Sequence, residues 1–100
     1  MKGFASTEIS ISQFVTNVEA ALAGRDLGEI VSFKLTGSEL LVTFSKLGKS
    51  ELRYSIENAS GGFKAKLIAE KIALTHRPLK SDITSRLARV MEKHGAQCDL

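Results

Sequence analysis

Apolar residues near the start of the chain recur at helical spacing. Every fourth position is apolar at Phe14, Val18 and Leu22. Ser10 and Gln13 precede this run with the spacing of a capping box, in which the serine hydroxyl accepts a hydrogen bond from a free backbone N–H. Gly24 follows the run and can adopt the left-handed conformation that ends many helices. The pattern predicts a first helix from about residue 12 to residue 23.

Three segments in the middle of the chain alternate apolar and polar residues. Their apolar positions are Val31, Phe33 and Leu35, then Leu40, Val42 and Phe44, then Leu52, Tyr54 and Ile56. A period of two is typical of strands that bury one face. Short glycine-containing segments at 36–38 and 47–50 separate the three runs. The sequence therefore predicts a three-stranded antiparallel meander.

The second face of this meander is predicted to be mainly polar. Its expected side chains are Lys34, Thr43, Ser45, Arg53 and Ser55. Ile30 and Leu41 also fall on this face in the predicted alternation. Apolar residues on an otherwise polar surface indicate a protein partner or a homodimer that contacts this exposed sheet face.

The segment Phe63–Leu74 fits two structures. As a helix it gathers apolar residues on one face, at Ala65, Ile68, Ala69, Ile72 and Ala73. As a strand it alternates from Phe63 to Leu67 and then loses the alternation at Ile68. Its alanine, lysine, leucine and glutamate residues are good helix formers, so we favour the helix. The alternative is a fourth strand with a bulge.

A stripe of apolar residues predicts a final helix. Its members are Leu79, Ile83, Leu87, Val90 and Met91. Pro78 or Ser81 is expected to begin this helix and Gly95 to end it.

Together these patterns predict one α+β domain over residues 1–100. It consists of a helix, a three-stranded antiparallel meander and two C-terminal helices that pack on one face of the sheet. The alternative layout is β-α-ββββ-α, with Phe63–Leu74 as the fourth strand. Residues 1–7 and 96–100 are expected to fray.

Composition narrows the class of protein. The chain is 43% hydrophobic and 25% charged, which is typical of a globular domain. Cys98 is its single cysteine, and with two histidines the chain cannot supply a cysteine-rich zinc site, so we expect no metal and no cofactor. No apolar run has the roughly 20 residues of a membrane helix, and the N-terminus lacks the apolar stretch of a signal peptide. We therefore expect a cytoplasmic protein without a membrane span.

Positive charge is concentrated in the second half of the chain. The net charge is +3, and residues 61–100 hold eight basic and four acidic residues, or +4. A basic second half of this kind indicates either a polyanionic partner or helix faces whose charges are simply solvated.

No catalytic motif accompanies this charge. Cys98 lies near the C-terminus, and His76 lies at the boundary between two predicted elements, where a cap or surface position is more common than a catalytic base. We expect that the protein is not an enzyme.

The stretch Ala65–Leu74 resembles the second helix of the double-stranded-RNA-binding domain. That family's pattern is A-K-x-x-A-A-x-x-A-L, and this chain departs from it only at Glu70. The order of helix, three strands and helix over residues 10–74 is also similar. The family's Gly-Pro-x-His loop is absent, and residues 36–38 are Thr-Gly-Ser instead. The resemblance implies that Lys64 and Lys66 lie at a helix N-terminus and contact phosphates, with Lys71 further along.

The alternative layout resembles small proteins associated with polyhydroxyalkanoate granules. The features that carry this resemblance are a short strand at residues 8–11, a helix, four strands and a last helix reached through residues 77–80. It implies a location at a granule or lipid surface, with no chemistry of its own.

The sequence thus predicts a small binding domain for nucleic acid, including duplex RNA, through its basic C-terminal half. The predicted nucleic-acid-binding residues are Lys64, Lys66, Lys71, Arg86, Arg89 and Lys93. The alternative is a structural or adaptor module associated with a protein, granule or lipid surface.

Overall fold

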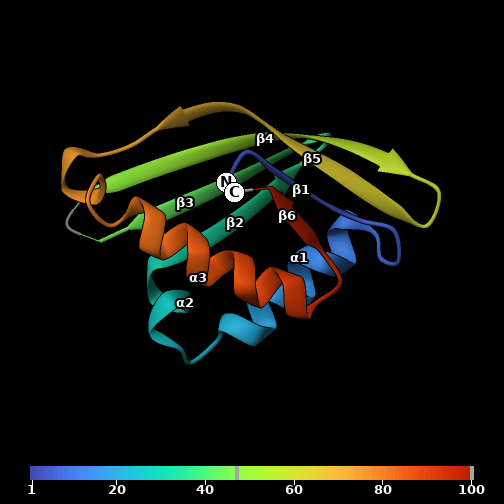
Figure 1. Ribbon diagram of the computed structural model, residues 1–100, viewed down its shortest axis with the longest axis horizontal. Coiled ribbons are helices and arrows are strands. Elements are labelled where there is room, and N and C mark those ends of the chain that lie inside the picture. The colour runs from blue at the N-terminus through green and yellow to red at the C-terminus, as the bar shows by residue number, and fades with distance from the viewer. Residues whose placement is uncertain (47, 100) are drawn as a thin grey trace.

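A computed structural model describes residues 1–46 and 48–99. Over these residues an antiparallel sheet forms one layer, and the helices form a second layer that covers one face of the sheet (Figure 1). The elements in chain order are β1 (Gly3–Ser6), α1 (Ile11–Leu22), α2 (Asp26–Ile30), β2 (Val31–Thr36), β3 (Glu39–Ser45), β4 (Lys49–Ala59), β5 (Gly62–Lys71), the 3-10 helix η1 (Leu74–His76), α3 (Lys80–Lys93) and β6 (Gln97–Asp99). The strand order across the sheet is β2-β3-β4-β5-β1-β6. The class is therefore α+β, as predicted.

The first predicted helix is confirmed, and so is its cap. Ser10 is extended, and its hydroxyl accepts a hydrogen bond from the Gln13 backbone N–H at 3.4 Å. The Gln13 side chain does not return to the cap but donates to Asn17 Oδ1 at 2.9 Å. Gly24 follows with φ of +78°, the left-handed conformation that its position predicts.

The three predicted strands are present as β2, β3 and β4, but they belong to a sheet of six strands in which β5 continues the meander. Leu35 on β2 pairs with Leu40 on β3, which in turn pairs with Tyr54 on β4. The turn between β2 and β3 contains Gly37 at φ of +56°. Because apolar positions stay in register across all three strands, they share the face that the helices cover.

The predicted helix at Phe63–Leu74 is wrong, because residues 62–71 form strand β5. This strand pairs with β4 along its length and with β1 over residues 63–66, so the backbone groups of its first half are satisfied by two neighbours. The register shifts beside Arg53 and Tyr54: Tyr54 pairs with Leu67, Arg53 pairs with Ala69, and Ile68 is the extra residue of a bulge. Pairing on both sides outweighs the helix propensity of this segment, and the prediction of two C-terminal helices is replaced by η1 and α3.

Both ends of the chain belong to the sheet. We expected residues 1–7 and 96–100 to fray, but β1 lies between β5 and β6, and β6 forms one edge; Leu100 lies outside the described residues. Phe4 explains why β1 docks. Its ring lies 5.2 Å from the Tyr54 ring and 5.9 Å from the Phe63 ring between centroids, inside the core. The strand at residues 8–11 in the granule-protein layout lies earlier, at residues 3–6.

The last helix is confirmed with a different beginning. α3 buries Ile83, Leu87 and Met91 against the sheet, but Leu79 precedes the helix and is 44% exposed. Gly95 follows it at φ of +93°. The short helix α2 was not predicted. It moves Ile30 from the outer sheet face, where the alternation placed it, to a position that packs against the core.

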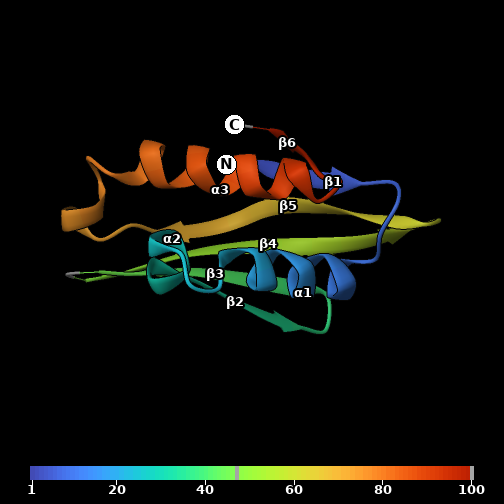
Figure 2. The same cartoon turned by 90° about the horizontal axis from the view of Figure 1, so that it is seen from below.

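The helices α1, α2 and α3 all lie on the same side of the sheet (Figure 1), and Figure 2 views the molecule from that side. The core therefore sits between one sheet face and these helices. No described helix is both long and apolar enough to cross a bilayer.

Candidate binding surface on the open sheet face

The sheet face that the helices leave uncovered carries the polar residues. We call it the open face. Strand alternation and register place on it Lys34, Leu41, Thr43, Arg53, Ser55, Lys64 and Lys66. The prediction of a polar outer face is confirmed for the strands, with Leu41 as a half-buried apolar residue on it.

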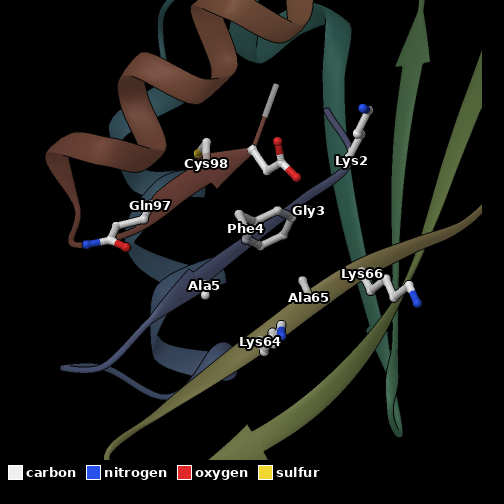
Figure 3. Close-up of a pocket in the computed structure, with 10 residues that line it drawn as sticks. Lys2, Gly3, Phe4, Ala5, Lys64, Ala65, Lys66, Gln97 and Cys98 are labelled. Carbon is white, nitrogen blue, oxygen red and sulfur yellow. The ribbon is translucent and has the colours of Figure 1, made fainter.

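A groove lies on this face along β1. Gly3 and Ala5 have little or no side chain, while β5 presents Lys66 and Lys64 beside them, and β6 presents Asp99 and Gln97 on the other side. The result is an open cavity of about 360 Å³, lined by β1, β5, β6 and Lys2 (Figure 3). No residue of α1 or α3 lines the cavity, which places it on the open face.

The floor of the groove depends on a glycine. A Cβ atom at position 3 would lie 2.6 Å from the carbonyl oxygen of Ala65, closer than real Cβ atoms approach. Gly3 therefore lets β1 approach β5 closely. The same absence of a side chain keeps the space above β1 open between the two walls.

Positive charge predominates at the groove. Lys2, Lys64 and Lys66 line it, against one carboxylate, Asp99. None of these three lysines forms an ion pair with any residue that the structure describes. Glu57 on β4 lies opposite Lys64, and no ion pair joins it to any residue of the described ranges.

Elsewhere on the open face two of the basic residues are paired with carboxylates. Arg53 lies 3.1 Å from Glu39, and Lys49 lies 3.9 Å from Glu51. Lys34 and Lys71 also lie on the open face without an ion pair to any described residue, so the positive excess extends along the face and is not confined to β1.

The six predicted nucleic-acid-binding residues do not form one surface. Lys64, Lys66 and Lys71 lie on β5, with Lys71 at the far end, roughly 20 Å along the strand from Lys64. The other three are exposed on α3, in the helix layer on the opposite side of the sheet: Arg86, Arg89 and Lys93. Arg86 is also paired with Asp82 at 3.2 Å. Because residues 62–71 are a strand, no helix N-terminus adds to the charge of Lys64 and Lys66.

A buried polar cluster was missed by sequence reasoning. His76, expected at the surface or at a cap, is only 1% exposed. Its Nε2 lies 2.5 Å from the carbonyl oxygen of Lys46, and its Nδ1 lies 2.5 Å from Ser50 Oγ. The Ser50 hydroxyl also accepts a hydrogen bond from the Ala73 backbone N–H at 2.9 Å.

These partners define the hydrogen-bond roles of the histidine. A carbonyl oxygen only accepts, so Nε2–H donates to Lys46, and in the neutral ring Nδ1 accepts from the Ser50 hydroxyl. Ser50 is fully buried, so this serine–histidine pair is closed to a substrate and acts as a structural clamp. Ser50 and His76 are 26 residues apart in sequence, and no local pattern signals their contact.

Cys98 lies on β6 and not in a frayed tail. It is half-buried against the core, with Sγ 3.9 Å from the carbonyl oxygen of Ala88. Burial, together with nearby Glu92, raises the pKa of the thiol to about 11. The thiol is therefore protonated near neutral pH, which makes it a poor nucleophile.

Every aromatic ring of the chain lies on the side of the sheet that the helices cover. Five of the six are buried, at Phe4, Phe14, Phe44, Tyr54 and Phe63. The sixth, Phe33, is partly buried and packs against the core. The open face thus has lysines but no ring on which a base could stack.

Comparison with known proteins adds no relative to this description. No protein-family model, no curated protein and no solved structure matches the chain.

Proposed function

We propose that this protein is a small non-enzymatic domain that binds the phosphate backbone of duplex nucleic acid at the groove on its open face. The observation that carries the proposal is the pair Lys64 and Lys66, two exposed lysines without ion-pair partners among the described residues, beside a groove floored by Gly3 and Ala5. Lys2 adds a third ammonium group to the same groove. Lysine ammonium groups at such a surface attract phosphates and displace their counterions.

The geometry favours backbone contacts over base reading. Lys64 and Lys66 are two residues apart on one strand, so their Cα atoms are roughly 7 Å apart and both side chains leave the same face. Contacts of this kind position a nucleic acid without reading its sequence.

The placement of the aromatic residues favours a duplex over a single strand. Proteins that bind single strands use exposed rings on which bases stack, and here all six rings face the core. A duplex presents its phosphates outward and needs no such stacking. The proposed site is smaller than the sequence predicts, because Arg86, Arg89 and Lys93 lie on the other side of the molecule.

The chemistry of the described side chains supports a binding role without catalysis. The serine–histidine pair is buried, the Cys98 thiol has a raised pKa, and the groove is lined by the single carboxylate of Asp99. The described lining of the groove contains no histidine and no pair of carboxylates, the groups that most often serve as general acid and general base.

The test is a titration with a short RNA duplex at two salt concentrations, using wild type and the Lys64→Glu/Lys66→Glu variant. The variant is expected to bind at least about tenfold more weakly. The slope of log K against log salt concentration should become shallower by nearly one for each phosphate that the lysines no longer neutralise. Neither side chain belongs to the core, so the circular dichroism spectrum and the melting temperature should stay close to those of wild type.

The matched control is Arg86→Glu/Arg89→Glu, which makes the same change in net charge on α3. This control should retain most of the duplex affinity. An equal loss in both variants would show that general charge and not the groove governs binding. The proposal is contradicted if wild type does not bind the duplex at low salt. It is also contradicted if wild type binds a single strand of the same length more tightly than the duplex.

A further inference from the structure

The connection between β5 and α3 exposes apolar side chains at one end of the molecule. Three large apolar residues are strongly exposed in the described chain, and two of them lie within six positions here. Leu74 is 75% exposed and Leu79 is 44% exposed. The segment that holds them lies beside the β3–β4 turn at the left end of the long axis in Figure 1. We call this end, residues 72–79 with Lys46, Lys49 and Lys71, the apolar tip.

The tip is held in place and is not a loose loop. His76 bridges it to the β3–β4 turn through Lys46, and the Ala73 N–H donates to Ser50 on β4. Gly48 packs closely against it, because a Cβ atom there would lie 2.9 Å from Thr75 Oγ1. A buried clamp thus fixes a segment that keeps two leucines in solvent. Preorganisation of this kind lowers the entropy lost when the leucines are buried by a partner.

The charges around the leucines are positive in excess. Lys46, Lys71 and Arg77 are exposed and form no ion pair with any residue in the described ranges. Carboxylates on the neighbouring elements are already paired, and Asp82, the nearest in sequence, lies 3.2 Å from Arg86. Glu51 lies 3.9 Å from Lys49, and Glu70 lies 3.0 Å from Lys80.

We infer that the apolar tip docks on an anionic lipid bilayer, with Leu74 and Leu79 entering the interface and the surrounding cations facing the lipid headgroups. Apolar burial and attraction to anionic lipids act together in proteins that bind membranes peripherally. Complementary charge is the reason to favour a lipid surface of this kind over a neutral one. The inference is independent of nucleic-acid binding, because Lys64 and Lys66 lie elsewhere, beside the groove.

Co-sedimentation with vesicles tests the inference. Wild type should bind vesicles of phosphatidylcholine with phosphatidylglycerol and bind phosphatidylcholine alone much more weakly. Leu74→Ser/Leu79→Ser should reduce binding to the anionic vesicles by about tenfold or more, because it removes the apolar groups that enter the interface. Both leucines are exposed, so the melting temperature of this variant should stay near that of wild type.

Three charge variants separate the tip from the rest of the surface. Lys46→Glu/Arg77→Glu should lose vesicle binding, whereas Arg86→Glu/Arg89→Glu, with the same change in net charge, should keep it. Lys64→Glu/Lys66→Glu should keep vesicle binding and lose duplex binding. Loss of duplex binding alone would leave the lipid inference standing, and loss of vesicle binding alone would leave the nucleic-acid proposal standing.

A fluorescent probe gives a second readout. The chain has no tryptophan, so a Leu74→Trp variant reports on one position only. Its emission should shift to shorter wavelength when anionic vesicles are added, whereas an Ala69→Trp variant on β5 should not respond. The inference is overturned by unchanged emission of Leu74→Trp, by wild type that does not bind anionic vesicles, or by equal binding to neutral ones. It is also overturned if the leucines instead mediate self-association that Leu74→Ser/Leu79→Ser abolishes.

Discussion

The two faces of the sheet differ in how their polar and charged groups are satisfied. The covered face packs alternate residues of β2, β3, β4 and β5 against α1 and α3, and its few polar groups are satisfied by hydrogen bonds. No buried side-chain N or O atom within residues 1–46 and 48–99 lacks a partner. The open face carries lysines without ion-pair partners among these residues, charges of both signs and a groove. The buried polar groups of the covered face are satisfied within the protein, whereas the lysines of the open face are exposed to solvent, where the proposed function places phosphate contacts.

Core-facing and open-face side chains alternate along each strand with a period of two residues. On β5, Ala65 faces the core while its neighbours Lys64 and Lys66 face the groove. Residues adjacent in sequence therefore have unrelated roles. Substitutions of residues that face the core should change stability more than substitutions on the open face, and the three predictions below concern that difference.

The largest difference in unfolding free energy is expected between a leucine on the covered side of the sheet and a leucine on the open face. Leu87 on α3 is fully buried, so Leu87→Ala should lower the free energy of unfolding by about 2–5 kcal/mol. Leu41→Ala on the open face should lower it by less than about 1 kcal/mol, because Leu41 is only half-buried. Urea denaturation of both variants gives the measurement. Equal losses would show that another molecule, or a second copy, covers the open face.

A smaller effect is expected for the two serines on β4. Ser50→Ala removes the hydroxyl that joins the Ala73 N–H to His76, so it should cost about 1–3 kcal/mol. Ser55→Ala, on the open face of the same strand, should change stability by no more than about 0.5 kcal/mol. The same denaturation assay compares them. A neutral Ser50→Ala would mean that the tip is not held by this clamp.

The smallest effect is expected for Tyr54 and depends on pH. Burial raises the pKa of the Tyr54 hydroxyl above its ordinary value of 10.0, and the hydroxyl donates a hydrogen bond to the Met1 carbonyl oxygen at 2.8 Å. The folded state therefore holds this proton more tightly than the unfolded state, and the associated stability is present below pH 10.0 and lost as pH rises above it.

Tyr54→Phe tests this dependence. It should cost about 1 kcal/mol at neutral pH, because the hydrogen bond to Met1 is removed. Above pH 10.0 its stability should fall less steeply than that of wild type, as measured by urea midpoints across this range. Parallel curves for the two proteins would assign the alkaline loss to other groups, among them Cys98, whose pKa is also raised.

The sequence by itself determined the elements whose signals are local. The Ser10 cap and the Phe14 stripe define α1, strict alternation defines β2, β3 and β4, and the Leu87 stripe defines α3. In each case the deciding residues lie within one element or one turn of each other, so periodicity and capping are visible in the chain. The polar character of the open face follows from the same alternation.

Only the tertiary structure decided the rest. β1 and β6 have four and three residues, too few for a periodic signal, and they exist because they pair with strands distant in sequence. β5 consists of good helix formers, yet two flanking strands and a bulge at Ile68 make it a strand. The groove, the clamp at His76 and the separation of Lys64 from Arg86 depend on these pairings. Strand pairing draws its free energy from backbone groups far apart in the chain, and residue type alone does not specify those partners.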